Sequence, residues 1–298
     1  MTTNVIALAT KFQPILDEIY KAASLTALMD ARSKPVNFAG ANVVKVYKTT
    51  LVGLGTYSRT GGYPLGDVVG AWETLTLATE RARELFIDRE DDEETLGMAF
   101  GTLVGQYMRE KVVPEVDAYR FSKYASWSSI SEVGTPATLS SSTVLAAIDA
   151  AIAQLNADEV PVDGRLLFVS DAVQGFLDAA VNRMYSNEKA ISTEVKEYNR
   201  MPVIMVPQTR FYKGITLDAG ATTAAGGFSK TGSTGRDINF MMIHPTAVLQ
   251  VKKHDNLKLF DPDTNQAKDG WKIQYRLYHD AFVYDNKVDG VYSHIKAS

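Results

Sequence analysis

Residues 43–81 read VVKVYKTTLVGLGTYSRTGGYPLGDVVGAWETLTLATER, and this stretch decides the fold. Residues 43–48 have the β-branched and aromatic composition of a strand, and residues 74–81 alternate as a second strand does. Between them, residues 53–70 hold six glycines and Pro64, too many for a packed element and too many residues for a tight turn. We therefore expect two arms of a long hairpin. Because a two-stranded arm is only marginally stable alone, it should lie against a neighbouring subunit.

Helices are predicted on both sides of the hairpin. Residues 12–31 form an amphipathic pattern with Pro14 near the first turn. After the acidic stretch at residues 88–94, the spacing of Leu96, Phe100, Leu103 and Tyr107 predicts the start of a long helix. Pro114 interrupts that pattern and should kink or split the helix.

The second half of the chain predicts an α/β unit behind a Ser, Gly and Pro-rich loop at residues 126–142. We expect a helix over 144–155, a strand over 165–169, a helix from Asp171 and a strand over 203–206. Residues 209–235 are rich in Gly, Thr and Ala and predict an exposed loop or irregular hairpin. Strands should follow at 238–243, 248–251 and 273–284.

The composition narrows the class of protein. The chain has 298 residues, 45% hydrophobic and 22% charged, which suits one large or two small globular domains. The absence of cysteine excludes disulfides, thiolate nucleophiles and cysteine-rich zinc sites. A net charge of -4 argues against a protein that mainly grips phosphate backbones, so contact with nucleic acid should be weak. No uncharged apolar run is long enough to span a bilayer, and we expect no membrane contact.

Two short motifs resemble catalytic or phosphate-binding signatures, and both fail. Residues 186–189 (SNEK) and 230–232 (KTG) match the patterns of penicillin-recognising acylases, but the spacing leaves no room for the domain that those enzymes insert. Residues 227–232 have the outline of a phosphate loop, yet Ser233 stands where the lysine is required.

A calcium-loop pattern and a histidine metal site are rejected for similar reasons. Asp261, Asp263 and Asn265 begin like a calcium loop, but Gln266 replaces the turn glycine and Lys272 the bidentate glutamate, so a solvated turn is expected. The four histidines show no metal-binding spacing. We predict no catalytic residue, no cofactor site and no metal site.

Three phrases in order resemble one family. They are AWETLTL leading into RARELFID at residues 71–88, VVPEVDAYR at 112–120 and HPTAV at 244–248. Set around a glycine-rich hairpin and a long helix, they resemble the major capsid proteins of tailed phages with the Hong Kong 97 fold. The resemblance implies an α+β chain with an N-terminal arm, an extended hairpin loop, a peripheral domain with a long spine helix and an axial α/β domain.

The resemblance also implies a division of the chain. Residues 1–40 would be the N-terminal arm, 41–90 the extended loop, 91–136 the peripheral domain with its spine helix and 137–255 the axial domain. Residues 256–298 would return as strands to the peripheral domain. Because the sequence begins directly with the arm, the resemblance implies a separate scaffolding protein.

The expected function is self-assembly, not catalysis. The chain would form pentamers and hexamers of an icosahedral phage head, assembled in the host cytoplasm, with a portal, possible cement proteins and weak non-specific contact with packaged DNA as further partners. Tyr57, Tyr63 and Trp72, with Arg59 as the only basic residue of segment 53–70, are the predicted inter-subunit contacts. The alternatives are an encapsulin-type shell around a cargo enzyme, and a soluble α/β enzyme with an unrecognised site.

Overall fold

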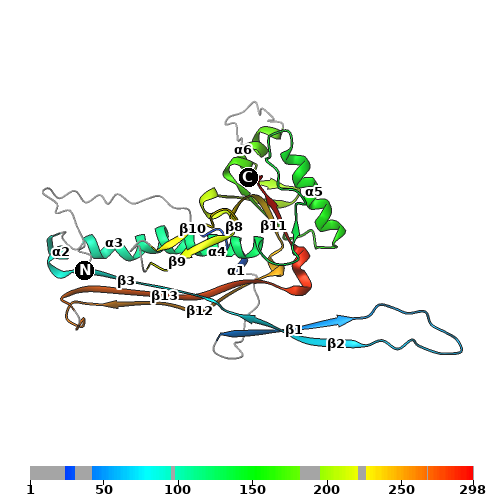
Figure 1. Ribbon diagram of the computed structural model, residues 1–298, viewed down its shortest axis with the longest axis horizontal. Helices are drawn as coiled ribbons and strands as arrows, with labels where there is room; N and C mark the ends of the chain where they lie inside the picture. Colours follow the sequence, from blue (N-terminus) through cyan, green and yellow to red (C-terminus); the bar gives the residue numbers. More distant parts are fainter. Residues whose placement is uncertain are drawn as a thin grey trace, which may run out of the picture.

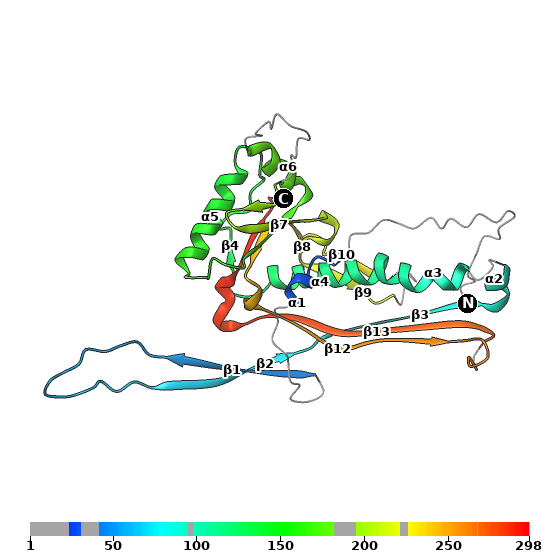
Figure 2. The ribbon, with the colours of Figure 1, turned by 180° about the vertical axis from the view of Figure 1, so that it is seen from behind.

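The structure is a computed structural model, which describes residues 24–30, 42–94, 98–181, 195–220, 226–266 and 268–297. A two-stranded hairpin projects from one side of the molecule (Figure 1). A long helical run lies along three long strands on the other side, and a unit of helices and a second sheet stands above the junction (Figures 1 and 2). Residues 12–23 of the first predicted helix, like the SNEK motif, lie outside the described residues; the short helix α1, Ala27–Asp30, falls within its predicted end.

Three antiparallel strands form the base, in the order β12-β13-β3. They are β3 (Thr79–Asp88), β12 (Val248–Phe260) and β13 (Gly270–Val283). The predicted alternation along β13 is confirmed, because Ile273, Tyr275 and Leu277 are buried and the residues between them are more exposed. Strand β12 runs nine residues beyond the predicted end at Val251, along the edge of the sheet.

A helical run crosses the buried face of this sheet. It comprises α2 (Arg89–Glu94), then α3 (Met98–Tyr107), a π-helical segment (Met108–Val112) and α4 (Val113–Ala125). Pro114 was predicted to kink or split the helix, and the structure has a π-helical turn there. Proline lacks an N–H. Just before it, the Val113 N–H donates to the Met108 carbonyl, five residues back. Helical structure continues directly into α4. The hydrogen-bond spacing therefore changes at this point, but the helical run does not end.

The second sheet has seven strands and lies between α4 and two other helices. The order is β4-β14-β11-β5-β7-β6, with β8 also paired to β11. Its central strand β5 buries Leu166 and Phe168 against α4, and Leu167 and Val169 against α5 and α6. The elements are β4 (Ser131–Glu132), α5 (Val144–Ala157), β5 (Leu166–Ser170), α6 (Asp171–Ala180), β6 (Glu197–Tyr198), β7 (Met201–Val206), β8 (Tyr212–Lys213), β11 (Arg236–Ile243) and β14 (Val291–Ile295).

The predicted exposed segment 209–235 is partly an irregular hairpin, as expected, formed by β9 (Ile215–Asp218) and β10 (Gly227–Lys230). Its beginning is not exposed, which corrects the prediction: Arg210 and Phe211 are buried. Phe211 packs on Phe121 with ring centroids 5.1 Å apart, and Arg210 donates to Asp117 of α4 at 3.3 Å. A buried arginine in a polar segment gives no sequence signal, because its partner lies far away in the chain.

Strand pairing crosses the predicted domain limits at three places. Strand β12 runs through the limit at residues 255 and 256. Strand β14 joins the seven-stranded sheet beside β11 and does not return with β13 to the three-stranded sheet. Strand β3, placed in the extended loop by the prediction, pairs along ten residues with β13.

A buried carboxylate fastens the N-terminal segment to α4. Asp117 accepts hydrogen bonds from the backbone of Leu25 and Thr26 at 3.0 and 3.3 Å and from the Thr26 hydroxyl at 2.6 Å. The Ser24 hydroxyl adds a bond at 2.9 Å, and Arg210 supplies the compensating charge. Three separate segments therefore meet at one carboxylate.

Asp117→Ala should lower the free energy of unfolding by about 3–5 kcal/mol, because it removes a buried carboxylate that pairs with Arg210 and accepts four hydrogen bonds from residues 24–26. Chemical denaturation followed by circular dichroism measures this loss. Asp163→Ala, at an exposed position, is the matched control and should change little. Equal stability of the two variants would show that the Asp117 cluster does not hold the fold together.

Candidate subunit interface

The projecting hairpin is the first candidate surface. Strands β1 (Val43–Leu51) and β2 (Val68–Thr76) pair antiparallel over nine residue pairs, from Val43 with Thr76 to Leu51 with Val68. The predicted hairpin is thus confirmed, but its second arm is displaced. The predicted strand 74–81 is cut at residues 77–78, where β2 ends and β3 begins, and its last residues pair with β13 instead of β1.

One face of the hairpin is covered by its own subunit. Val44 and Leu75 are buried with Leu249, Val251 and Phe282 near the root. Further out on the same face, Lys48 forms an ion pair of 2.7 Å with Asp285. This hydrogen bond raises the pKa of Lys48, whereas partial burial, followed by the nearby Asp285 charge, raises the pKa of Glu73.

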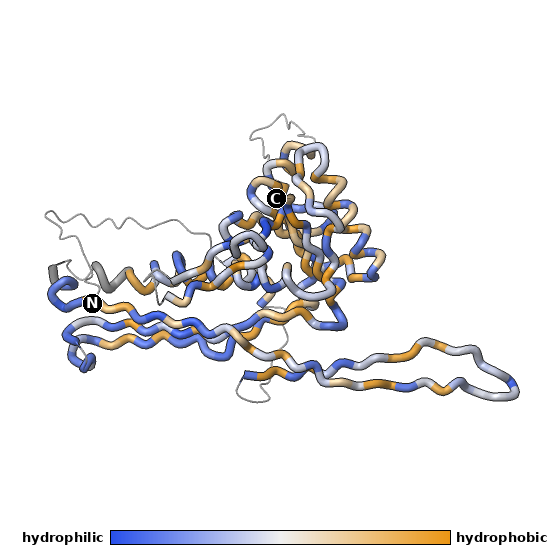
Figure 3. Tube along the Cα trace, in the orientation of Figure 1, coloured by the Kyte–Doolittle hydropathy of each residue, from blue (hydrophilic) through white to orange (hydrophobic). Residues whose placement is uncertain are grey.

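The opposite face is left uncovered. Because side chains alternate along a strand, Tyr47, Leu51, Val68 and Trp72 all point away from Val44 and Leu75. The Tyr47 and Trp72 rings meet edge to face with centroids 5.0 Å apart, yet each side chain is more than half exposed. A side chain at Gly70 would collide with the Tyr47 hydroxyl, so the end of the Tyr47 ring lies over that position. The described part of the subunit leaves this face exposed, on a hairpin whose trace runs clear of the rest of the chain (Figure 3).

The tip of the hairpin is organised, although its glycine content predicted no packed element. The backbones of Ser58 and Gly62 exchange two hydrogen bonds, and Gly62 has a φ of 79°, which favours glycine. The Tyr57 and Tyr63 rings close the turn at 5.1 Å, and Arg59 lies exposed within it. Ordered aromatic groups at an exposed tip suit contact with another molecule.

The four predicted contact residues therefore lie in two clusters: Trp72 on the uncovered face, and Tyr57, Arg59 and Tyr63 at the tip. All four are exposed, and their role as contacts stays a prediction. Tyr47 was missed. Its place on the same face of the strand as Lys45 could be read from the sequence, but its position opposite Trp72 depends on the register of the hairpin.

The uncovered apolar area extends along most of the hairpin. Large contiguous apolar surfaces of soluble proteins mark interaction sites. The exposed large apolar side chains of this element are Tyr47, Leu51, Val52, Leu54, Tyr57, Tyr63, Leu65, Val68, Val69 and Trp72.

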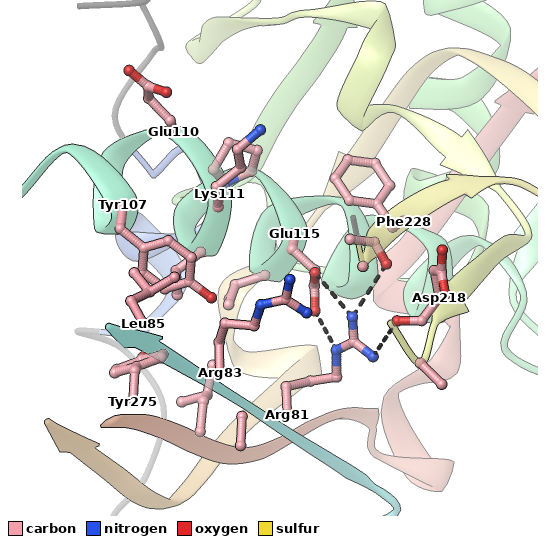
Figure 4. Close-up of a pocket in the computed structure, with 18 of the residues that line it drawn as sticks. Arg81, Arg83, Leu85, Tyr107, Glu110, Lys111, Glu115, Asp218, Phe228 and Tyr275 are labelled. Carbon is pink, nitrogen blue, oxygen red and sulfur yellow. Dashed lines mark hydrogen bonds and ion pairs between the residues drawn. The ribbon is translucent and has the colours of Figure 1, made fainter. Parts of the chain in front are cut away.

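A second candidate is a pocket of about 520 Å³ between β3, the helical run and the β9–β10 hairpin (Figure 4). Arg81 dominates one wall, where it forms an ion pair of 2.6 Å with Glu115 and donates to the carbonyls of Asp218 and Gly227. These contacts make Arg81 a strut that joins β3 to α4 and to the β9–β10 hairpin. Among the described residues that line the pocket there is no histidine, serine or cysteine.

The described part of the chain presents neither a metal-binding cluster nor a helix suited to a membrane. No group of three His, Asp or Glu side chains gathers there in a way that could hold a metal ion. The calcium-like segment forms a turn in which the Thr264 N–H donates to Asp261 at 2.8 Å. Within the described ranges, no helix combines the length and apolar character needed to cross a bilayer.

Comparison with known proteins identifies the fold. No protein-family model and no curated protein matches the sequence. Solved structures do match: the capsid of cyanophage P-SCSP1u has a TM-score of 0.69 at 12% identity, covering 97% of this chain and 93% of that one. The chain has the fold of tailed-phage capsid proteins. The predicted α+β capsid fold is thereby confirmed as a whole.

Further matches agree over nearly the full length. The structure of Mycobacterium phage Che8 has a TM-score of 0.67 at 13% identity and 96% coverage of both chains. The mature capsid of bacteriophage PhiM1 gives 0.65 at 12% identity, over 96% of this chain and 90% of that one. A virus-like particle from Pyrococcus furiosus is less similar, with a TM-score of 0.51 at 10% identity over 88% and 90% of the two chains.

Trp72→Ala should impair association while lowering the free energy of unfolding of the subunit by less than about 1.5 kcal/mol, because its ring packs on Tyr47 but stays 62% exposed. Leu75→Ala is the matched control, three residues along the same strand but on the buried face. It should cost about 2–5 kcal/mol of subunit stability. Light scattering measures association, and denaturation measures stability; equal effects of both changes on stability would place Trp72 in the subunit core.

Proposed function

We propose that this chain is the major capsid protein of a tailed phage, which assembles as pentamers and hexamers into the icosahedral head around the genome. One observation carries the proposal: a projecting hairpin presents an aromatic face that its own subunit leaves uncovered. The full-length similarity to phage capsid structures supports the same function. In this proposal the chain catalyses no reaction and holds no cofactor.

The hairpin suits a shell that contains both pentamers and hexamers. One subunit must then accept slightly different neighbours, which a glycine-rich element with a narrow attachment allows. Many weak contacts also let wrong associations dissociate, while the closed shell is held by their sum. The net charge of -4 limits adhesion to packaged DNA.

The proposal includes partners and a location beyond the shell itself. A separate scaffolding protein, a portal and possible cement proteins would act with the chain in the host cytoplasm, before the finished head becomes part of the virion. We also propose a division of the chain into arm, extended loop, spine-helix region and axial domain, with two limits moved to follow strand pairing. Residues 1–40 are the arm, β3 passes from the extended loop to the spine-helix region, and β14 joins the axial domain.

The encapsulin-type shell is the weaker alternative, because the matching structures with the higher TM-scores include phage capsids. The soluble enzyme is also the weaker alternative, because the matching structures named above include phage capsids. The contents of purified particles separate the two shells: phage heads enclose DNA, whereas an encapsulin encloses a cargo protein.

Purified chain should form hollow particles, or pentamers and hexamers, because the uncovered face needs a second subunit to bury it. Electron microscopy and analytical ultracentrifugation measure this. Limited proteolysis adds a local readout: residues 52–67 should be cleaved first in free subunits and protected after assembly. A stable monomer whose hairpin resists protease would overturn the proposal.

The mature shell should contain no covalent links between subunits made through the hairpin tip. Residues 53–70 contain no lysine, and the Arg59 guanidinium stays protonated and cannot act as an amine nucleophile. Boiling in detergent should give a single band near 32.7 kDa. A ladder of linked multimers, with mass spectrometry locating a bond to Lys45 or Lys48, would contradict this.

A further inference from the structure

The hairpin joins the subunit body at residues 77–78, and hydrogen bonds fix this junction. The Leu77 N–H donates to the Asn42 carbonyl at 2.9 Å, and the Leu77 carbonyl accepts from the Tyr278 hydroxyl at 3.1 Å. The Ala78 N–H donates to the carboxylate of Asp280 at 2.9 Å. The chain changes sheets here, leaving β2 and entering β3, so these bonds hold the point about which the hairpin would turn.

Asp280 connects the junction to the long helical run. The Thr79 hydroxyl donates to the Tyr119 hydroxyl oxygen at 2.7 Å, and the Tyr119 hydroxyl donates to Asp280 at 2.8 Å. Tyr119 belongs to α4 and Asp280 to β13, and Thr79 is the first residue of β3. One short chain of hydrogen bonds therefore links the helix, the sheet and the base of the hairpin.

The surroundings keep these groups in one protonation state. Burial raises the pKa of Tyr119, so its hydroxyl remains a donor at neutral pH. The His279 ring packs edge to face on Tyr119 at 5.2 Å, and burial, followed by the charge of Arg120, lowers the pKa of His279 to about 3. Tyr119 and His279 therefore both stay uncharged near neutral pH.

We propose that Thr79, Tyr119 and Asp280 form a latch that sets the angle at which the hairpin leaves the subunit and ties this angle to the position of α4. Asp280 is almost fully buried, and a buried carboxylate that loses a donor is strongly disfavoured. The junction therefore favours one defined geometry over a continuous range. The use of that geometry in shell assembly rests on the proposed function, whereas the latch itself rests on the hydrogen bonds.

Distances between two spin labels in the full chain test the latch directly. The sequence has no cysteine, so Thr50→Cys on β1 and Ala153→Cys on α5, both exposed, give the only two labelling sites. Labelled chain is diluted with unlabelled chain so that only distances within one subunit are measured. Pulsed electron paramagnetic resonance should show a single narrow distribution for the otherwise unchanged protein and loss of that narrow peak in Tyr119→Phe, which keeps the ring and removes the hydroxyl.

Tyr124→Phe is the matched control, because Tyr124 is a fully buried tyrosine of the same helix and lies outside the hydrogen-bond chain. It should keep the narrow peak. If Tyr119→Phe does not fold, Thr79→Val removes the other hydroxyl of the latch and should broaden the distribution too. A distribution in the folded latch variant as narrow as in Tyr124→Phe would overturn the latch even if shells form, while failure to form any particle would overturn the proposed function alone.

Discussion

A two-stranded hairpin cannot cover both of its own faces, and this constraint governs the molecule. The inner face is buried within the subunit, because Val44 and Leu75 pack in a cluster with residues of β12 and β13. The described part of the subunit leaves Tyr47 and Trp72, on the outer face, more than half exposed. Exposed aromatic area of this kind is unfavourable in a monomer and becomes favourable when a second molecule removes it from water. In the proposed shell, association would follow from this unequal covering of the two faces of the hairpin.

The rest of the subunit gives this element a firm base. The hairpin continues without a loop into β3, whose ten residues pair with β13, and Arg81 of β3 is fixed to Glu115 of α4. A load applied to the hairpin therefore reaches the three-stranded sheet and the helical run together. Packed cores of this type deform little, so a change in the angle of the hairpin would require the hydrogen bonds at residues 77–78 to rearrange.

Local patterns predicted much of this arrangement. β-Branched and aromatic composition predicted β1, alternation predicted β13, and apolar spacing predicted α5. The hairpin followed from two strands around a glycine-rich segment. The break at residues 77–78 could not be predicted, because Ala78 is held by Asp280, 202 positions away. Burial of Arg210 against Asp117 likewise depends on a distant partner. Trp72 was a visible candidate for the interface, whereas Tyr47 required the pairing register that only the folded hairpin defines.

The long-range polar contacts that could not be predicted from the sequence involve one helix, α4. Asp117 of α4 holds the N-terminal segment and Arg210, while Tyr119, two residues on, reaches the junction of the hairpin through Asp280. Apolar packing alone would tolerate a slide of α4 between the two sheets, but buried hydrogen bonds are satisfied in only one register. Since the same helix also packs Phe121 against the seven-stranded sheet, its position relates the hairpin to that sheet. In the proposed shell, compliance between neighbours would then come from the hairpin and its contacts, because α4, which connects the parts of the subunit, is fixed on several sides.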